Sequence, residues 1–333
     1  MKWTIGESHT GRKLNDERGS AAYSFVGFMI VVVVIIAAIF VIPDLGRKTP
    51  DSALASARAA MAKQDWEKAV SLFDQAIKAQ PGNIDAYIGR SAAYLNTGKL
   101  ADALADADNA VKLDPDSAPA YGQKAIVEKV LGQDEAAIGT FTKALELDGN
   151  YAWAYAQRAH ILSKLGDQEK ALVDVNKALE ASPNFADGFR VRAWVLTRMG
   201  KCKEASEDFS KVAQLKPNDA WSIQDRAWFL MTCPDEKLRD GTKALELARK
   251  AHEMTEGQDA VVQETLAEAY FQAGDAAKAA ELQEKAIALK SKSCPQGSCA
   301  DEMKIRLKKY TLAARNEERK SYEILPLDST YRP

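Results

Sequence analysis

The hydrophobic residues of this chain follow a helical period over most of its length. Across residues 152–165, apolar side chains recur three or four positions apart, as on one face of an α-helix. Gly166 interrupts the pattern, which resumes over residues 170–181 and stops before Pro183, because the residue before a proline disfavours helical backbone. This segment therefore predicts a hairpin of two helices joined by a tight turn.

The same hairpin pattern recurs at intervals of 34 residues. A fixed period of this length is typical of solenoids, in which each hairpin leaves an apolar face that the next hairpin covers. Three columns of small residues carry the period: Ala69, Ala103, Ala137, Ala171 and Ala205; Gly98, Gly132, Gly166 and Gly200; and Ala76, Ala110, Ala144 and Ala178, which Val212 continues.

The order of these residues resembles the tetratricopeptide repeat family. In residues 84–117 the family pattern falls on Ser91, Tyr94, Gly98, Ala103, Ala107, Ala110 and Pro115, with Ala107 in place of the usual aromatic residue. The resemblance implies an all-α fold, a right-handed solenoid whose concave groove binds proteins or peptides. It places seven repeats within residues 50–293, at 50–83, 84–117, 118–151, 152–185, 186–219, 220–259 and 260–293.

The sixth repeat is longer than the others. Its first helix is predicted to end near Thr232, and the sequence CPDEKLRDG then replaces the usual two-residue turn before the pattern resumes at Ala244. Solenoids tolerate extra residues in such turns. The altered repeat also resembles one found in many bacterial repeat proteins, which implies a bacterial source and an interaction role.

Residues 25–42 are uncharged and apolar. A helix of this run would span about 27 Å, close to the thickness of a bilayer core. A buried core helix would normally carry a polar stripe, and a cleavable signal peptide has a shorter apolar region followed by a small-residue cleavage site. We therefore favour a transmembrane anchor, which would bind the membrane through one helix.

The charges around this run favour one orientation. Four basic residues (Lys2, Arg12, Lys13 and Arg18) precede it, and two (Arg47 and Lys48) closely follow it. Positive residues are enriched on the cytoplasmic side. The sequence therefore predicts a single-pass bacterial inner-membrane protein with residues 1–24 as a cytoplasmic tail and a periplasmic repeat domain. A cytoplasm-facing assembly factor is the alternative topology.

A column of basic residues occupies the seventh position of successive repeats: Arg90, Lys124, Arg158, Arg192 and Arg226. Three aspartates, Asp106, Asp174 and Asp208, each follow one of the arginines by 16 residues, on the partner helix of the same hairpin. We interpret these as structural ion pairs in preference to a basic ladder for an acidic ligand.

The resemblance also implies which residues face the groove, because the family uses the second, fifth, ninth, twelfth and thirteenth positions. Candidate partner-binding residues at these positions are Trp153, His160, Asp187, Arg190, Trp194, Trp221, Gln224 and Trp228. The Lys/Asn set with which chaperone-binding relatives clamp a C-terminal carboxylate is absent, so that ligand is disfavoured. The tryptophans also fit an alternative function, the binding of peptidoglycan or another glycan.

Composition adds no sign of catalysis or of nucleic-acid binding. The 45 basic and 47 acidic residues nearly balance, so no basic footprint is present. The three histidines are scattered, without metal-ligand spacing, and no Gly-rich phosphate loop occurs. The sequence predicts a protein-interaction scaffold with no catalytic residue, cofactor or metal.

The four cysteines form two candidate disulfides. Cys202 begins the second helix of the fifth repeat and Cys233 ends the first helix of the sixth, so stacking would bring them together. Cys294 and Cys299 form a second pair. They lie in residues 294–333, which are predicted to hold a capping helix and a tail. A reducing compartment would leave four free thiols.

Overall fold

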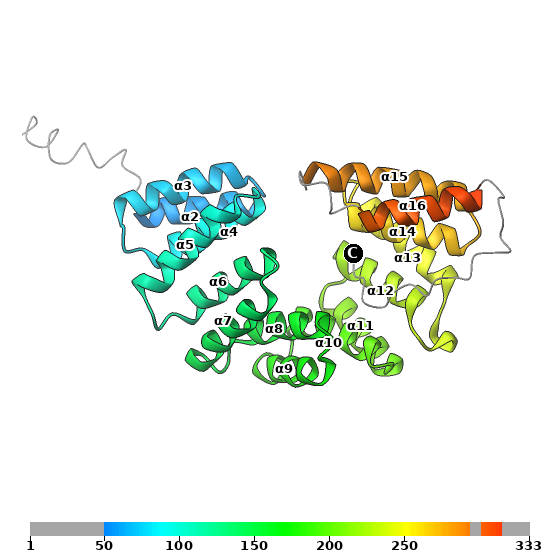
Figure 1. Cartoon of the computed structure of the whole chain (residues 1–333), viewed down its shortest axis with the longest axis horizontal. Coiled ribbons are helices and arrows are strands. Elements are labelled where there is room, and N and C mark those ends of the chain that lie inside the picture. The colour runs from blue at the N-terminus through cyan, green and yellow to red at the C-terminus, as the bar shows by residue number, and fades with distance from the viewer. Residues whose placement is uncertain (1–49, 294–300, 315–333) are drawn as a thin grey trace, which may run out of the picture.

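The computed structural model describes residues 50–293 and 301–314. Within these residues the chain forms fifteen α-helices and one short 3-10 helix, and contains no strand (Figure 1). The helices are α2 (Pro50–Ala62), α3 (Trp66–Ala79), α4 (Ile84–Asn96), α5 (Leu100–Leu113), α6 (Ala118–Val130), α7 (Asp134–Leu147), α8 (Ala152–Lys164), α9 (Gln168–Ala181), α10 (Ala186–Arg198), α11 (Cys202–Leu215), α12 (Ala220–Thr232), η2 (Glu236–Leu238), α13 (Gly241–Met254), α14 (Ala260–Gln272), α15 (Ala276–Ser293) and α16 (Asp301–Ala314).

These helices pair into hairpins that stack one on the next, from α2 with α3 to α14 with α15. Figure 1 shows the stack curving into an arc, with α6, α8 and α10 on its inner side and α7 and α9 on its outer side. The helix α16 packs on the final hairpin. The predicted all-helical solenoid is therefore confirmed.

No helix among the described residues is long and apolar enough to cross a lipid bilayer. The predicted span, residues 25–42, lies outside the described residues, as does the predicted tail, residues 1–24. The lack of a membrane-spanning helix among the described residues contradicts the predicted localisation, a single-pass protein in a bacterial inner membrane with a periplasmic repeat domain. No described helix supplies the anchor on which that prediction depended.

The small-residue columns explain why the hairpins form. The alanines of two columns, one from Ala69 to Ala205 and one from Ala76 to Ala178, are fully buried. Their small side chains let the helix backbones approach closely. Between the helices, Gly98, Gly132, Gly166 and Gly200 have φ between 73° and 91°. Glycine adopts this left-handed conformation without the steric cost that a β-carbon adds, so the column places each turn.

The predicted arginine–aspartate pairs are confirmed, and each arginine also reaches the preceding hairpin. Arg158 on α8 donates from Nε and Nη2 to the two carboxylate oxygens of Asp174 on α9, at 2.7 and 2.8 Å, and from Nη1 to Thr142 on α7 at 2.8 Å. Arg90 and Arg192 repeat this arrangement. These side chains join three helices, so they fix the stacking of neighbouring hairpins.

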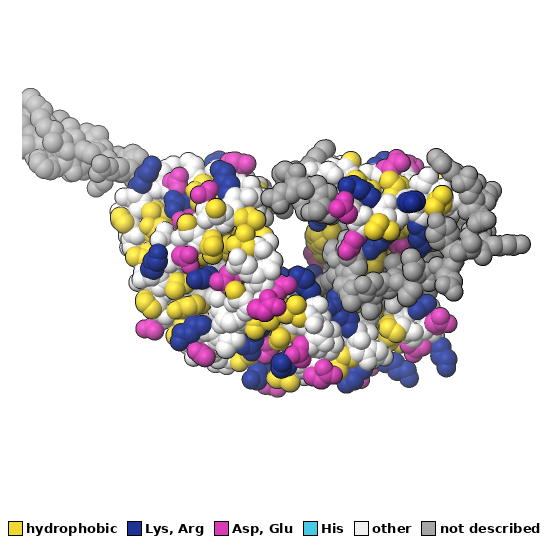
Figure 2. All heavy atoms as spheres, in the orientation of Figure 1, with side chains coloured by type: hydrophobic (Ala, Val, Ile, Leu, Met, Phe, Trp, Pro, Cys, Tyr) yellow, Lys and Arg dark blue, Asp and Glu magenta, His cyan; other side chains and the backbone are white. Residues whose placement is uncertain are grey.

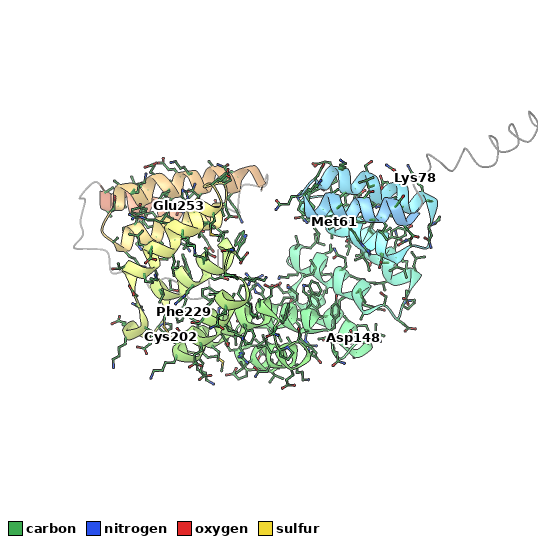
Figure 3. All side chains as sticks on the ribbon, turned by 180° about the vertical axis from the view of Figure 1, so that it is seen from behind. Met61, Lys78, Asp148, Cys202, Phe229 and Glu253 are labelled. Carbon is green, nitrogen blue, oxygen red and sulfur yellow. A yellow bond between two sulfur atoms is a disulfide. The ribbon has the colours of Figure 1, made fainter. Side chains whose placement is uncertain are left out.

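The long turn of the sixth hairpin contains η2 and packs against the fifth hairpin. Cys233, at the end of α12, forms a disulfide with Cys202, at the start of α11, across a Cα–Cα distance of 6.4 Å. Cys202 lies beside Phe229 in the same buried cluster (Figure 3). Arg239 closes the turn by donating from Nε to the backbone oxygen of Cys233 at 2.7 Å. Cys294 and Cys299 lie outside the described residues, so their pairing stays a prediction.

We expect reduction of the Cys202–Cys233 bridge to lower the free energy of unfolding by about 3–4 kcal/mol, because the bridge closes a loop of about 30 residues in the unfolded chain. Denaturant titrations with and without a phosphine reductant measure the change. The double variant Cys202→Ala/Cys233→Ala should be insensitive to the reductant. Four free thiols in the denatured, unreduced protein would contradict the bridge.

Candidate binding groove

A pocket of about 280 Å³ is formed where four first helices of successive hairpins meet. Figure 2 shows the opening between the two arms of the arc, and Figure 1 places α6, α8 and α10 on the inner side of that arc. The pocket is lined by Lys129 from α6; Ala156, Gln157 and His160 from α8; Asp187, Arg190 and Val191 from α10; and Trp221, Gln224 and Asp225 from α12. A ligand here would therefore touch four repeats at once.

The acidic and basic groups of the pocket are partly matched to one another. The Lys216 ammonium lies 3.0 Å from the carboxylate of Asp187, at the rim. Arg190 lies between two carboxylates: its Nη1 is 3.6 Å from Asp225 Oδ2, and its Nε is 3.9 Å from Asp187 Oδ1. Asp225 is only 4% exposed, so its carboxylate is a buried part of the pocket lining.

The amide side chains add hydrogen-bonding capacity. Gln157 accepts from Lys129 Nζ at 3.1 Å. Gln224 is buried and donates to Thr265 Oγ1 on α14 at 2.8 Å, which fixes its amide group. By contrast, Trp221 lines the pocket and is 42% exposed, so it offers aromatic surface to a ligand. The pocket thus combines charged groups, amides and one exposed aromatic surface, a mixture suited to a polypeptide segment.

The structure brings five of the eight predicted groove residues to this pocket. They are His160, Asp187, Arg190, Trp221 and Gln224.

The other three, all tryptophans, do not line it. Trp228 is 3% exposed and is covered by Arg306, whose guanidinium lies 5.6 Å from the indole. It is therefore a core residue, which corrects its prediction as a ligand contact.

Trp194 and Trp153 also serve packing in the structure. The Trp194 ring meets Phe209 of the partner helix edge-on, with centroids 5.2 Å apart. The Trp153 ring stacks on Tyr151 at 5.6 Å and lies against Gly122 of the preceding hairpin. Both rings are half-buried between helices, because at these positions a neighbouring element covers the face that the repeat pattern assigns to the groove.

Sequence reasoning missed five lining residues: Lys129, Ala156, Gln157, Val191 and Asp225. Lys129 and Ala156 occupy the twelfth and fifth positions, so the family rule contained the signal for them. Gln157, Val191 and Asp225 share the sixth position, which that rule omits. The curvature of the arc brings this column to the pocket.

Among the described residues, no cluster of three or more His, Cys, Asp or Glu side chains is arranged to hold a metal ion. The groups that line the pocket are suited to hydrogen bonding, charge pairing and aromatic contact.

Comparison with protein families finds matches to three models described as tetratricopeptide repeat. One matches residues 54–118 and again residues 90–152, a second matches residues 140–173, and a third matches residues 262–293. A search of curated proteins found no match.

Solved structures with the same fold cover most of the chain. A chain of the APC/C hetero-tetramer Cut9-Hcn1 is 14% identical, with a TM-score of 0.61, over 82% of this chain and 54% of its own. A tetratricopeptide repeat protein from Parabacteroides merdae is 17% identical, with a TM-score of 0.55, over 79% of this chain and 98% of its own. Yeast Tom70 is 19% identical, with a TM-score of 0.55, over 81% and 54%. At these identities the likeness concerns the fold alone.

Proposed function

The chain is a tetratricopeptide repeat protein, and from this premise we propose that it is a scaffold that binds a segment of a partner protein in the pocket between α6, α8, α10 and α12. Proteins of this family generally act as scaffolds and not as enzymes. The observation that carries the proposal is the pocket itself, since its walls come from four consecutive repeats.

The character of the lining favours a polypeptide over a glycan. A glycan-binding surface usually offers several aromatic faces, and the glycan alternative depended on the four predicted tryptophans. Only Trp221 lines the pocket, whereas the other three pack between helices. The pocket instead offers Gln157, whose amide suits a peptide main chain, and charged groups that suit side chains.

Site-specific photocrosslinking tests the proposal. With Trp221 replaced by the photoreactive p-benzoylphenylalanine, we expect irradiation of living cells to produce discrete covalent adducts with one or a few proteins. The same replacement at Val173, which is 55% exposed on α9 and lines no part of the pocket, is the matched control. Equal labelling from both positions would contradict a binding site at the pocket.

Adducts must also depend on the pocket chemistry. His160→Ala removes an imidazole from the pocket lining. Adding it should reduce the yield of adducts from the photoreactive residue at position 221 and leave the background labelling from position 173 unchanged. Mass spectrometry of the adducts then identifies the partner and the segment bound.

A further inference from the structure

Arg190 makes no hydrogen bond to the described residues, whereas the inner-helix arginines Arg90, Arg158 and Arg192 make three each. Its Nε atom is buried and donates no hydrogen bond. Its two neighbouring carboxylates, at 3.6 and 3.9 Å, are within ion-pair range but beyond good hydrogen-bond distance. A guanidinium has five N–H donors, and a buried donor without an acceptor is costly. Because Arg190 lines the pocket, an acceptor carried by a ligand would complete the hydrogen bonding of its guanidinium.

The neighbouring Arg192 shows what a structural arginine looks like in this fold. It lies two residues further along α10 and makes three hydrogen bonds, two to Asp208 at 2.8 Å and one to Asn176 at 3.2 Å. The contrast within one helix separates the two roles: Arg192 joins hairpins, and Arg190 keeps its donors toward the pocket.

The charge of the surroundings favours one negative charge in the ligand. The lining cations Lys129 and Arg190 balance the lining anions Asp187 and Asp225, and Lys216, which lies 3.0 Å from Asp187, adds a third positive charge. Three positive charges less two negative charges leave an excess of one. A carboxylate carries a single charge and matches the planar guanidinium fork, whereas a phosphate carries nearly two at neutral pH.

We propose that Arg190 is the anion receptor of the pocket and that the bound partner segment inserts an aspartate or glutamate side chain, with a neighbouring apolar residue packed on Trp221. The proposal rests on the proposed function and specifies the kind of segment that the pocket accepts. A side-chain carboxylate is favoured over a chain terminus, because the Lys/Asn set that clamps a terminal carboxylate in relatives is absent.

Peptide selection on the intact chain tests this inference. Random dodecapeptides with blocked ends are selected on the native protein, on Arg190→Gln and on Arg58→Gln. Arg58 is the matched control, since it pairs with Asp85 on the exposed surface. We expect aspartate and glutamate to be enriched about twofold or more by the native chain and by the control, but not by Arg190→Gln.

A double-mutant cycle then tests the pairing itself. Changing the acidic residue of a selected peptide to its amide should weaken binding about tenfold on the native chain and less than about twofold on Arg190→Gln. The cycle compares two peptides on one protein, so a change in the folded fraction of the variant cancels. Arg190→Lys keeps the charge and loses the fork, and should give an intermediate ratio.

The outcomes separate this inference from the proposed function. The selected peptides are also measured on Trp221→Ala. If this variant no longer binds them, but they show no acidic enrichment, or the amide change weakens binding equally on the native chain and on Arg190→Gln, the role of Arg190 is overturned and the pocket stays as the binding site. Peptides that bind equally well to Trp221→Ala would overturn the pocket and, with it, this inference.

Discussion

Replacement of Arg158 by methionine should lower the free energy of unfolding by about 3–5 kcal/mol, because it breaks a buried ion pair from one side. The methionine keeps most of the side-chain length, so the main change is electrostatic. Asp174 is 4% exposed and would lose both hydrogen bonds to the guanidinium, while Thr142 on the preceding hairpin would lose its donor. Urea titration followed by circular dichroism measures the loss.

Two companion variants show whether burial is the cause. Arg58→Met removes an exposed arginine from its pair with Asp85, whose side chain is 61% exposed, and should cost about 0–1 kcal/mol. The double variant Arg158→Met/Asp174→Leu removes both charges and should regain much of the loss. A similar loss for the Arg58 and Arg158 variants would show that the buried pair adds nothing beyond an ordinary surface contact.

The features that a single hairpin determines could be read from the sequence. The column through Ala171 and the turn glycine Gly166 place two helices and their contact, and the spacing of 16 residues between Arg158 and Asp174 brings these side chains together across that contact. All of these are local consequences of one repeat unit. For this reason the solenoid and its ion pairs were predictable without knowledge of the curvature.

The groove was only partly predictable, since it depends on elements that the repeat period does not describe. Trp228 and Trp194 occupy the same position of successive repeats, and Arg306 from α16 covers the first whereas Phe209 packs against the second. Conversely, Asp225 reaches the pocket from a position that the family rule leaves out. The curvature of the arc and the position of its final helix determine which face of an inner helix is exposed.

The final helix also carries the second large expected effect. We expect Arg306→Met to lower the free energy of unfolding by about 3–5 kcal/mol at neutral pH, because it leaves a buried carboxylate without its cation. Arg306 Nη1 donates to Glu264 Oε1 at 2.6 Å, and Glu264 is 1% exposed. The same guanidinium covers Trp228, so its loss would also expose part of the core. Urea titration measures the change, and Lys304→Met, on the exposed side of α16, is the control.

The loss should depend on pH in a direction fixed by Glu264. Burial raises the pKa of its carboxyl above the ordinary value of 4.5, while Arg306, Gln283 and Lys290 oppose the rise and Glu302 adds to it. Removing Arg306 raises this pKa further, so the folded variant binds a proton that the unfolded chain releases. Stability of the variant then falls as pH rises through the window between 4.5 and the raised pKa.

The stability deficit of Arg306→Met relative to the native chain should therefore shrink as pH is lowered from about 8 to about 5. Adding Glu264→Gln to the variant should abolish this dependence, and a deficit that stays constant with pH would show that the lost stability comes from packing on Trp228 and not from the buried charge.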